Sequence, residues 1–315
     1  MRVAFALILL VFAAGCLNGN PTNSTPPQTN SSSTVIETTT TTSTSIDVSS
    51  FTNASSCESV PGKRDRDTCY ENFGIESNDS ALCEKVMDRI KKGVCFWSVG
   101  KATTNPLLCD RIESAYEKDR CYEDLGALMK SPQICDMIQN DDGKDRCYLT
   151  TAIENSDPAT CRRIKQEATT ENCFFAVSLL RKDPNLCDML IDNATKTSCM
   201  FNISIMTLDA TLCQKLGVTA QDSCLLEVGG RTGNYTICDI LSNESLKNRC
   251  LNDAAVAGKN VGTCDKITDP WLIDTCYQTI GLALNNSSIC DSIKYPPKKR
   301  YCYEQTGEPE KAKRT

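Results

Sequence analysis

Cysteine is the residue type whose number and spacing in this sequence could do chemistry. Twenty of the 21 cysteines lie between Cys57 and Cys302, and consecutive ones are alternately 12 and 14 positions apart, except for 11 between Cys213 and Cys224. Thiolates can hold a metal or exchange electrons, but such sites usually need closely spaced CxxC or CxC pairs, which this row does not contain. The spacing therefore favours structural disulfides, which form in exported proteins, and we expect no metal site.

Two regular disulfide pairings are compatible with this spacing. Pairing across the 12-residue separations, as in Cys57–Cys69, uses all twenty cysteines, whereas pairing across the 14-residue separations, as in Cys69–Cys83, leaves Cys57 and Cys302 over. We favour the first pairing, in which each bridge closes a short loop and contributes up to about 3 kcal/mol through chain entropy. The expected disulfide cysteines are Cys57, Cys69, Cys83, Cys95, Cys109, Cys121, Cys135, Cys147, Cys161, Cys173, Cys187, Cys199, Cys213, Cys224, Cys238, Cys250, Cys264, Cys276, Cys290 and Cys302.

The composition excludes several classes of function. The sequence has no histidine, so a Ser/His/Asp or Cys/His triad and CxxCH haem attachment are impossible. The net charge is −6, and nothing in the charge pattern indicates a nucleic-acid partner. An enzyme would have to use carboxylate, Ser or Lys chemistry. The one candidate row, an acidic residue directly after the first cysteine of most pairs, recurs with the period instead of breaking it, so we expect no catalytic residues and no cofactor.

The residues around the cysteines repeat with them, in ten units of 26 residues that span 57–307, the seventh being one residue short. Four residues before the first cysteine of units two to ten stands Asp, Asn or Ser, which are preferred helix N-caps, and proline often follows. Three residues after that cysteine the side chain is always aliphatic, as at Val86 and Ile138. These positions predict a first helix of about two turns with its cysteine on the buried face.

The second cysteine of each unit belongs to a longer predicted helix. The next residue is large and apolar, the fourth residue on is mostly branched or aromatic, and the fifth is always small, as at Gly126 and Ala152. These spacings trace one face of a helix of three to four turns. Each unit is therefore a hairpin too short to be stable alone. We expect an all-α fold, an α-solenoid of ten disulfide-stapled helical hairpins, which resembles tetratricopeptide and similar repeats.

The chain begins with an apolar segment that differs from the repeats. Residues 1–15 combine Arg2, a run of twelve apolar residues and a small-residue end, which predicts a signal peptide because the run is too short to span a bilayer. The sequence Ala-Ala-Gly-Cys at 13–16 resembles the lipobox of prokaryotic lipoproteins. This resemblance implies cleavage before Cys16 and lipidation of its thiol, the alternative being cleavage near Gly15 that leaves Cys16 free.

Residues 16–56 form a second distinct segment. They are rich in Ser, Thr, Asn and Pro and too poor in apolar side chains to fold, so we interpret them as a disordered stalk. N-glycosylation sequons begin at Asn23, Asn30 and Asn53. A lipobox followed by a Thr-rich spacer resembles archaeal cell-surface lipoproteins, which implies a glycosylated protein held on the extracellular face of the cell membrane by a lipid on Cys16.

A few features break the period and are candidates for ligand contacts. They are Trp97, Arg162, the pair Gly229-Gly230, and Trp271 after an Asp269-Pro270 helix start. Each also has a structural interpretation. Trp97 would be a packed aromatic residue, Arg162 a result of sequence drift, the glycine pair a loop, and Trp271 part of a helix start. The stretch 294–300 is basic, which suits either a solvated end of the array or contact with an acidic glycan or protein. The polar tail 308–315 is suited to cover the last hairpin.

Two functions suit such an array. The first is an extracellular interaction scaffold that presents an extended surface to a protein or glycan, as solenoids commonly do. The second is a structural spacer or envelope component whose role is its shape and durability. A binding scaffold should cluster unit-specific aromatic and charged residues on one side of the array, whereas a spacer should not. We favour the scaffold.

Overall fold

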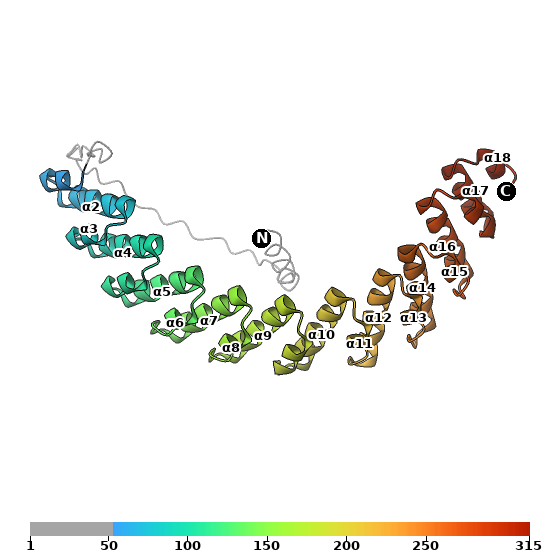
Figure 1. Cartoon of the computed structure of the whole chain (residues 1–315), viewed down its shortest axis with the longest axis horizontal. Helices are drawn as coiled ribbons and strands as arrows, with labels where there is room; N and C mark the ends of the chain where they lie inside the picture. The colour runs from blue at the N-terminus through green and yellow to red at the C-terminus, as the bar shows by residue number, and fades with distance from the viewer. Residues whose placement is uncertain (1–52) are drawn as a thin grey trace, which may run out of the picture. The chain divides into compact units, whose positions relative to one another are not determined.

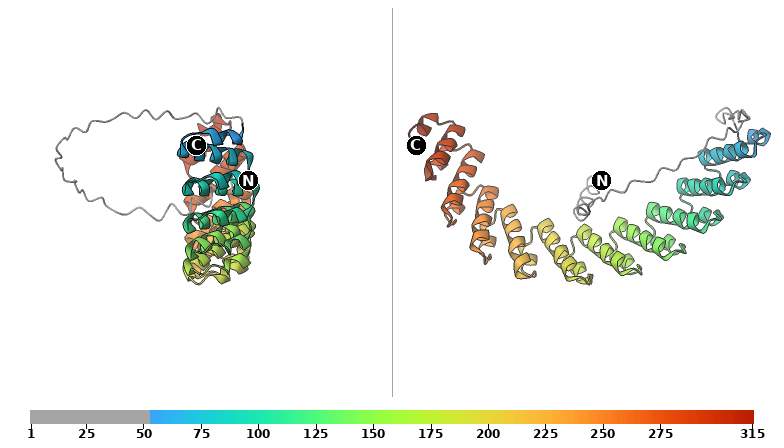
Figure 2. Two further views of the ribbon diagram at one scale, coloured as in Figure 1. Left: turned by 90° about the vertical axis from the view of Figure 1, so that its left-hand side faces the viewer. Right: turned by 180° about the vertical axis from the view of Figure 1, so that it is seen from behind.

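The computed structural model describes residues 53–315 of the 315-residue chain. The predicted signal peptide 1–15, the lipidation site Cys16 and most of the predicted stalk, with Asn23 and Asn30, lie outside the described residues. Within residues 53–315 every regular element is a helix, and the helices follow one another in chain order as a curved row of hairpins (Figure 1 and Figure 2). The predicted all-α array of ten disulfide-stapled hairpins is thus confirmed.

Each hairpin pairs a short first helix with a long second helix. The short helices are η2 (Ala54–Ser59), α3 (Ser80–Lys85), η3 (Pro106–Arg111), α6 (Pro132–Cys135), α8 (Pro158–Cys161), η4 (Pro184–Met189), α11 (Ala210–Cys213), α13 (Tyr235–Cys238), α15 (Val261–Cys264) and η5 (Ser287–Ser292). The long helices are α2 (Lys63–Ser77), α4 (Arg89–Thr103), α5 (Ala115–Met129), α7 (Asp141–Asn155), α9 (Glu167–Arg181), α10 (Asn193–Thr207), α12 (Val218–Thr232), α14 (Glu244–Gly258), α16 (Pro270–Ala283) and α17 (Pro296–Gln305). The tail adds α18 (Pro309–Ala312), which packs on α17 and buries Ala312.

The short helices have four or six residues. The 3₁₀ helices η2, η3, η4 and η5 have six residues and so reach the two turns that the sequence predicts, whereas the four-residue α-helices have about one turn. The aliphatic residue three positions after the first cysteine ends the helix instead of extending it. Val86 has an extended backbone (φ −70°, ψ 125°), donates its N–H to the carbonyl of Cys83, and buries its side chain completely. Cys83 and Cys95 are bonded to each other and lie only 12 positions apart in the sequence. The chain therefore has few residues in which to leave the short helix and begin the long one.

The predicted N-caps start the helices. The Asp79 side chain accepts a hydrogen bond of 2.9 Å from the N–H of Ala81 at the start of α3. Asp269 and Pro270 start α16 as the sequence predicts. Asn53, one of the glycosylation candidates, is the N-cap of η2 and so occupies the same capping position in the first hairpin.

All ten disulfides lie within hairpins, which is the first of the two candidate pairings. The two Cα atoms of each bridge are 5.5–5.8 Å apart, and all twenty cysteines are completely buried. The shorter seventh loop, from Cys213 to Cys224, closes in the same way. Each bridge fastens a short helix to the long helix of its hairpin, and the bridges form part of the hydrophobic core.

The position of the long helix that is always small faces the disulfide of the next hairpin. A Cβ atom added to Gly126 would lie 2.6 Å from Sγ of Cys147, and one added to Gly229 would lie 2.8 Å from Sγ of Cys250. A contact this close leaves no room for a larger side chain without movement of the disulfide. At these two positions the small residue admits a neighbouring sulfur atom, whereas a Cβ atom added to Gly100 would lie nearest the backbone oxygen of Asn105, at 3.3 Å.

Neighbouring hairpins pack in one repeated way. From the second hairpin on, each short helix sits between the long helix of its own hairpin and the preceding long helix, as α3 does between α4 and α2. Contacts at both ends show that successive long helices run in the same direction. Lys298 near the start of α17 donates to Thr275 near the start of α16 (2.6 Å), and Asn155 at the end of α7 donates to the carbonyl of Lys130 just after α5 (2.7 Å). The starts of the long helices therefore lie along one edge of the array.

Candidate interaction edge

The most exposed large apolar side chains gather at the starts of the long helices. We call the connection before each long helix, together with the first turn of that helix, the helix-start edge. Among the described residues, seven large apolar side chains expose 60% or more of their surface. Six of these are on the helix-start edge, namely Met87, Ile90, Tyr116, Ile191, Val218 and Trp271, and the seventh is Leu107 in η3. Single exposed apolar residues are normal on a protein surface, but their concentration on one edge is a sign of an interaction site.

Buried carboxylates hold the connections of this edge in place. Asp274, two residues before the second cysteine of hairpin nine, accepts hydrogen bonds of 2.9 and 2.8 Å from the backbone N–H groups of Lys294 and Tyr295 in hairpin ten. The same two bonds to the next hairpin are made by Asp67, Asp119, Asp145 and Glu171. Hydrogen bonds to an ionised acceptor are stronger than neutral ones. The connections that carry Met87 and Ile191, and the connection that leads to Tyr295, are therefore fixed before any partner arrives.

An aromatic group with a lysine forms the edge between hairpins nine and ten. The ring centroids of Trp271 and Tyr295 are 5.6 Å apart, with 53° between the ring planes. Nζ of Lys298 lies 3.4 Å from the Trp271 ring centroid and donates to the carbonyl of Trp271 (3.0 Å) and the hydroxyl of Thr275 (2.6 Å). We call Trp271, Tyr295 and Lys298 the Trp271 cluster. Both of its rings remain exposed, although they contact each other and the lysine.

The chain segment that contributes Tyr295 and Lys298 to the Trp271 cluster is basic. Between Asp291 and Glu304 the chain has no acidic residue and four basic ones, Lys294, Lys298, Lys299 and Arg300. The nearby carboxylates are engaged with backbone, since Asp269 caps α16 and Asp274 accepts from the next connection. Burial lowers the pKa of Lys298, and Asp274 and Asp269 act in the opposite direction.

A second section of the edge lies at hairpins two and three. Ile90 and Tyr116 stand five residues before the second cysteine of their hairpins, which is also the position of Trp271 in hairpin nine. Arg89 and Glu113 form an ion pair of 2.5 Å between these two hairpins. The same position of the edge therefore carries exposed apolar residues at both sections, in different polar surroundings.

The other residues that break the period have structural roles. Trp97 donates its indole N–H to Asp124 of the next hairpin at 3.2 Å and packs against the core. Gly229 and Gly230 lie inside α12, so the interpretation of this pair as a loop is wrong. Arg162 is the exposed C-cap residue of α8.

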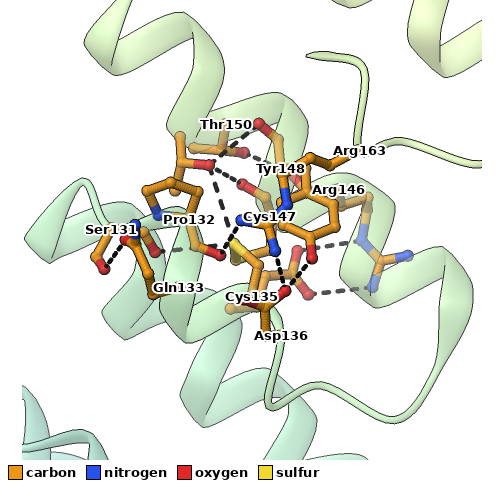
Figure 3. The surroundings of a disulfide bond; sticks show 12 residues. Ser131, Pro132, Gln133, Cys135, Asp136, Arg146, Cys147, Tyr148, Thr150 and Arg163 are labelled. Atoms are coloured by element: carbon orange, nitrogen blue, oxygen red, sulfur yellow. Dashed lines mark hydrogen bonds and ion pairs between the residues drawn. A yellow bond between two sulfur atoms is a disulfide. The ribbon is translucent and has the colours of Figure 1, made fainter. Parts of the chain in front are cut away.

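The acidic row after the first cysteines connects the two helices of a hairpin (Figure 3). Tyr148, directly after Cys147, donates its hydroxyl to Asp136, and Arg163 of the next hairpin also donates to Asp136 and lies 4.6 Å from the Tyr148 ring centroid. These bonds hold the pKa of Asp136 below its usual range. Burial and the bond to Asp136 raise the pKa of Tyr148 to about 12. The same tyrosine–aspartate pairs are Tyr277 with Asp265 and Tyr303 with Asp291.

A small open cavity lies between hairpins six and seven. It has a volume of about 210 Å³, and its lining includes Lys196, Thr197, Met200, Lys215 and Gly217. Thr197 stands where most other hairpins have a carboxylate, the further exceptions being Gly93, Asn248 and Arg300, and the connection that follows is one residue shorter. The cavity is thus a packing defect of this joint. Within residues 53–315 no three His, Cys, Asp or Glu side chains are grouped so that they could hold a metal ion.

Part of the helix-start edge is predictable from the sequence. Sequence reasoning singles out Trp271 and the basic stretch 294–300, and the structure brings them together. It misses Ile90 and Tyr116, and it includes Tyr295 only as a member of the basic stretch. The signal that could have found them is an apolar residue in the first turn, or at the N-cap, of an otherwise polar helix start.

Comparisons with other proteins add no assignment for this edge. None of the helices within residues 53–315 is long and apolar enough to cross a membrane. No family model matches the chain, and neither a curated protein nor a solved structure matches it. The function must therefore be argued from the helix-start edge.

Proposed function

We propose that the chain is a non-catalytic interaction scaffold of the cell surface, which is anchored by a lipid on Cys16 and binds an envelope protein or glycan along its helix-start edge. The observation that carries this proposal is that, of the seven most exposed large apolar side chains in residues 53–315, six lie on that edge. A spacer has no use for such a row, because exposed apolar residues promote association. A scaffold needs it, because apolar and aromatic residues supply most binding energy at protein surfaces.

The identities of these residues also support recognition. They come from hairpins two, three, six, seven and nine, and they include Met, Ile, Tyr, Val and Trp, so they differ from unit to unit while the core positions repeat. Ten disulfides support an exported location, because cytosolic thiols are kept reduced. The buried carboxylates support a preformed surface, since a fixed backbone lowers the entropy lost on binding.

Binding of the full-length protein to isolated cell envelopes tests the proposal, with Cys16→Ser as the background so that the lipid does not contribute. The two matched changes lie on the same long helix: Tyr116→Ser is on the edge, and Leu128→Ser, also exposed, is near the other end of α5. We expect Tyr116→Ser combined with Ile90→Ser to weaken binding about tenfold, as the loss of central apolar contacts does elsewhere, and Leu128→Ser to leave it unchanged. Equal binding by both variants, or no saturable binding by the parent protein, would favour the spacer.

The anchor is checked in the same cells. The N-terminal peptide of the mature protein should carry a diacylglyceryl group on Cys16, and Cys16→Ser should move the protein out of the membrane fraction. An unmodified N-terminal peptide contradicts the anchor and leaves the helix-start edge unaffected.

A further inference from the structure

We propose that the Trp271 cluster and the basic residues of hairpin ten form a binding site for an acidic polysaccharide. The inference rests on the proposed function, because it names the partner class for one section of the helix-start edge. Three properties of this section carry it: the open aromatic faces, their fixed positions and the surrounding positive charge.

The two rings offer surfaces that suit sugar rings. A pyranose presents rows of C–H groups that stack on aromatic faces, and Trp and Tyr combine an apolar face with a polar group for hydroxyls. Trp271 and Tyr295 expose 60% and 45% of their surfaces. Because their planes differ by 53° at a centroid distance of 5.6 Å, two sugar units of one chain can contact different rings.

The rings are held before the partner binds. The backbone N–H of Trp271 is bound by Asp269, and the N–H of Tyr295 is bound by the buried Asp274 at 2.8 Å. Lys298 fixes the relation between α16 and α17 through its bonds to Trp271 and Thr275. A surface that is already ordered loses little conformational entropy on binding, which matters for the weak contacts that single sugars make.

The charge selects an acidic polymer over a neutral one. Lys294 and Lys299 flank Tyr295 and Lys298 in the sequence. Nζ of Lys299 contacts a backbone carbonyl, that of Asp291, at 2.9 Å. Arg300 is exposed, and Glu304 lies 4.0 Å from its guanidinium. Lys and Arg bind carboxylate or sulfate groups through charge-assisted hydrogen bonds. Uronate or sulfate groups on the polymer would therefore meet basic side chains while the sugar rings meet the aromatic ones.

The side chains favour a polysaccharide over an anionic membrane, which also attracts Trp, Tyr and Lys. We consider the first turn of α16 and residues 295–305. The exposed large apolar residues there are Trp271, Tyr295 and Tyr301, and all three are aromatic. Among these described residues there is no exposed large aliphatic side chain to enter the hydrocarbon. The Trp271 ring is covered on part of its surface by Lys298, which limits its insertion into a bilayer.

Affinity electrophoresis of the full-length Cys16→Ser protein tests the inference, with polygalacturonate or a neutral glucan in the gel. We expect polygalacturonate to retard the protein, the glucan to have no effect, and the retardation to decrease as salt screens the charges. Trp271→Ala, and separately Lys294→Gln with Lys299→Gln, should weaken the affinity about tenfold, in the range of central interface residues. Leu128→Ala is the control, because it removes an exposed apolar side chain near the end of α5, away from the helix-start edge, and it should not change the retardation.

Several results would overturn the inference. One is equal retardation of Trp271→Ala and the parent protein, and another is equal retardation by the two polymers. A third is tighter, Trp271-dependent binding to vesicles of anionic lipid, which would assign the site to a membrane. If Trp271→Ala loses its native disulfide map, Trp271→Leu replaces it, because leucine keeps apolar bulk and removes the aromatic face. Failure here leaves the proposed function standing, since that function is tested by Ile90 and Tyr116.

Discussion

Single residues in the left-handed conformation end the long helices. Seven C-caps without glycine have positive φ, namely Asn78, Thr104, Lys130, Ser156, Lys182, Leu208 and Lys259, and Gly233 takes the same role after α12. This conformation lets the N–H of the following residue donate a hydrogen bond to a carbonyl in the last turn of the helix. The N–H of Asp209, for example, donates to the carbonyl of Ser204 at 3.1 Å. Residues with a Cβ atom are strained there by roughly 1–2 kcal/mol.

Leu208→Gly should therefore stabilise the protein. We expect the free energy of unfolding to rise by about 1 kcal/mol, because glycine removes the Cβ strain and this gain exceeds its greater entropy loss. Leu208 is exposed, so little apolar burial is lost with its side chain. Urea denaturation of the two proteins measures the change. Leu208→Ala is the control, since it removes the side chain but keeps the Cβ atom; a glycine variant no more stable than the alanine variant contradicts the argument.

The N-cap residues at the starts of α3 and α16 could be predicted from the sequence, but the C-cap residues at the ends of the long helices could not. Asp79 and Asp269 are residue types whose short polar side chains satisfy free N–H groups, so their position before a periodic segment is informative. Lys130 and Leu208 have no such preference for positive φ, and the sequence gives no local sign of it. The disulfide cysteines are predictable because a covalent bond imposes a strict spacing on the chain.

At the scale of elements, the buried carboxylate is the connection between one long helix and the next. Asp145 in α7 accepts bonds of 3.0 and 2.8 Å from the backbone N–H groups of Lys165 and Gln166 and is almost completely buried. In hairpin eight, Asn248 takes this position and its side-chain oxygen accepts from the N–H of Thr268 at 2.8 Å. An amide can thus replace the carboxylate with one backbone bond retained.

Asp145→Ala should destabilise the array more than Asp145→Asn. We expect a loss of about 2–4 kcal/mol for alanine, which removes two hydrogen bonds to a charged acceptor, and roughly half of that for asparagine. Urea denaturation monitored by circular dichroism measures both. Asp142→Ala, an exposed position on the same helix, is the control and should change stability little. Equal losses for alanine and asparagine would show that packing, not these hydrogen bonds, holds the joint.

The hairpins were predictable as pairs of helices, but the residues at which the helices end were not. Periodicity identifies the face of each helix, since the apolar and small positions recur at helical spacing. It does not indicate where a helix stops, and the buried Val86 continues the pattern beyond the end of α3. Asp145 was concealed for a related reason: its neighbours Lys144 and Arg146 are charged, so the sequence shows a polar stretch where one member is buried.

At the scale of the whole array, the joint between hairpins six and seven combines several departures from the repeat. Thr197 replaces the buried carboxylate, Gly217 provides no side-chain cap for α12, and the loop is one residue short. The buried core also divides here, with one cluster reaching Leu212 and the next beginning at Cys213. In a linear array, stability is roughly a sum of units and interfaces, so one weak interface separates two cooperative blocks.

Hydrogen exchange in mild urea should show these two blocks. We expect amides at the start of α12 to exchange faster than those at the equivalent start of α9, where Asp145 binds the connection. Hairpins one to six and seven to ten should then lose protection at different urea concentrations. Mass spectrometry after digestion resolves the two joints in one sample. Loss of protection at a single concentration along all ten hairpins would contradict a weak joint.

The covalent bridges also decide how the array responds to a pulling force. Every 12-residue loop between paired cysteines is closed, so only the 14-residue segments between one bridge and the next, such as Cys69 to Cys83, can be drawn out. Each such segment reaches about 50 Å when fully extended. An array under tension therefore lengthens in short, equal steps. Close to half of its residues lie inside closed loops and bear no force. The array thus has the properties of a tether with a fixed upper limit of extension.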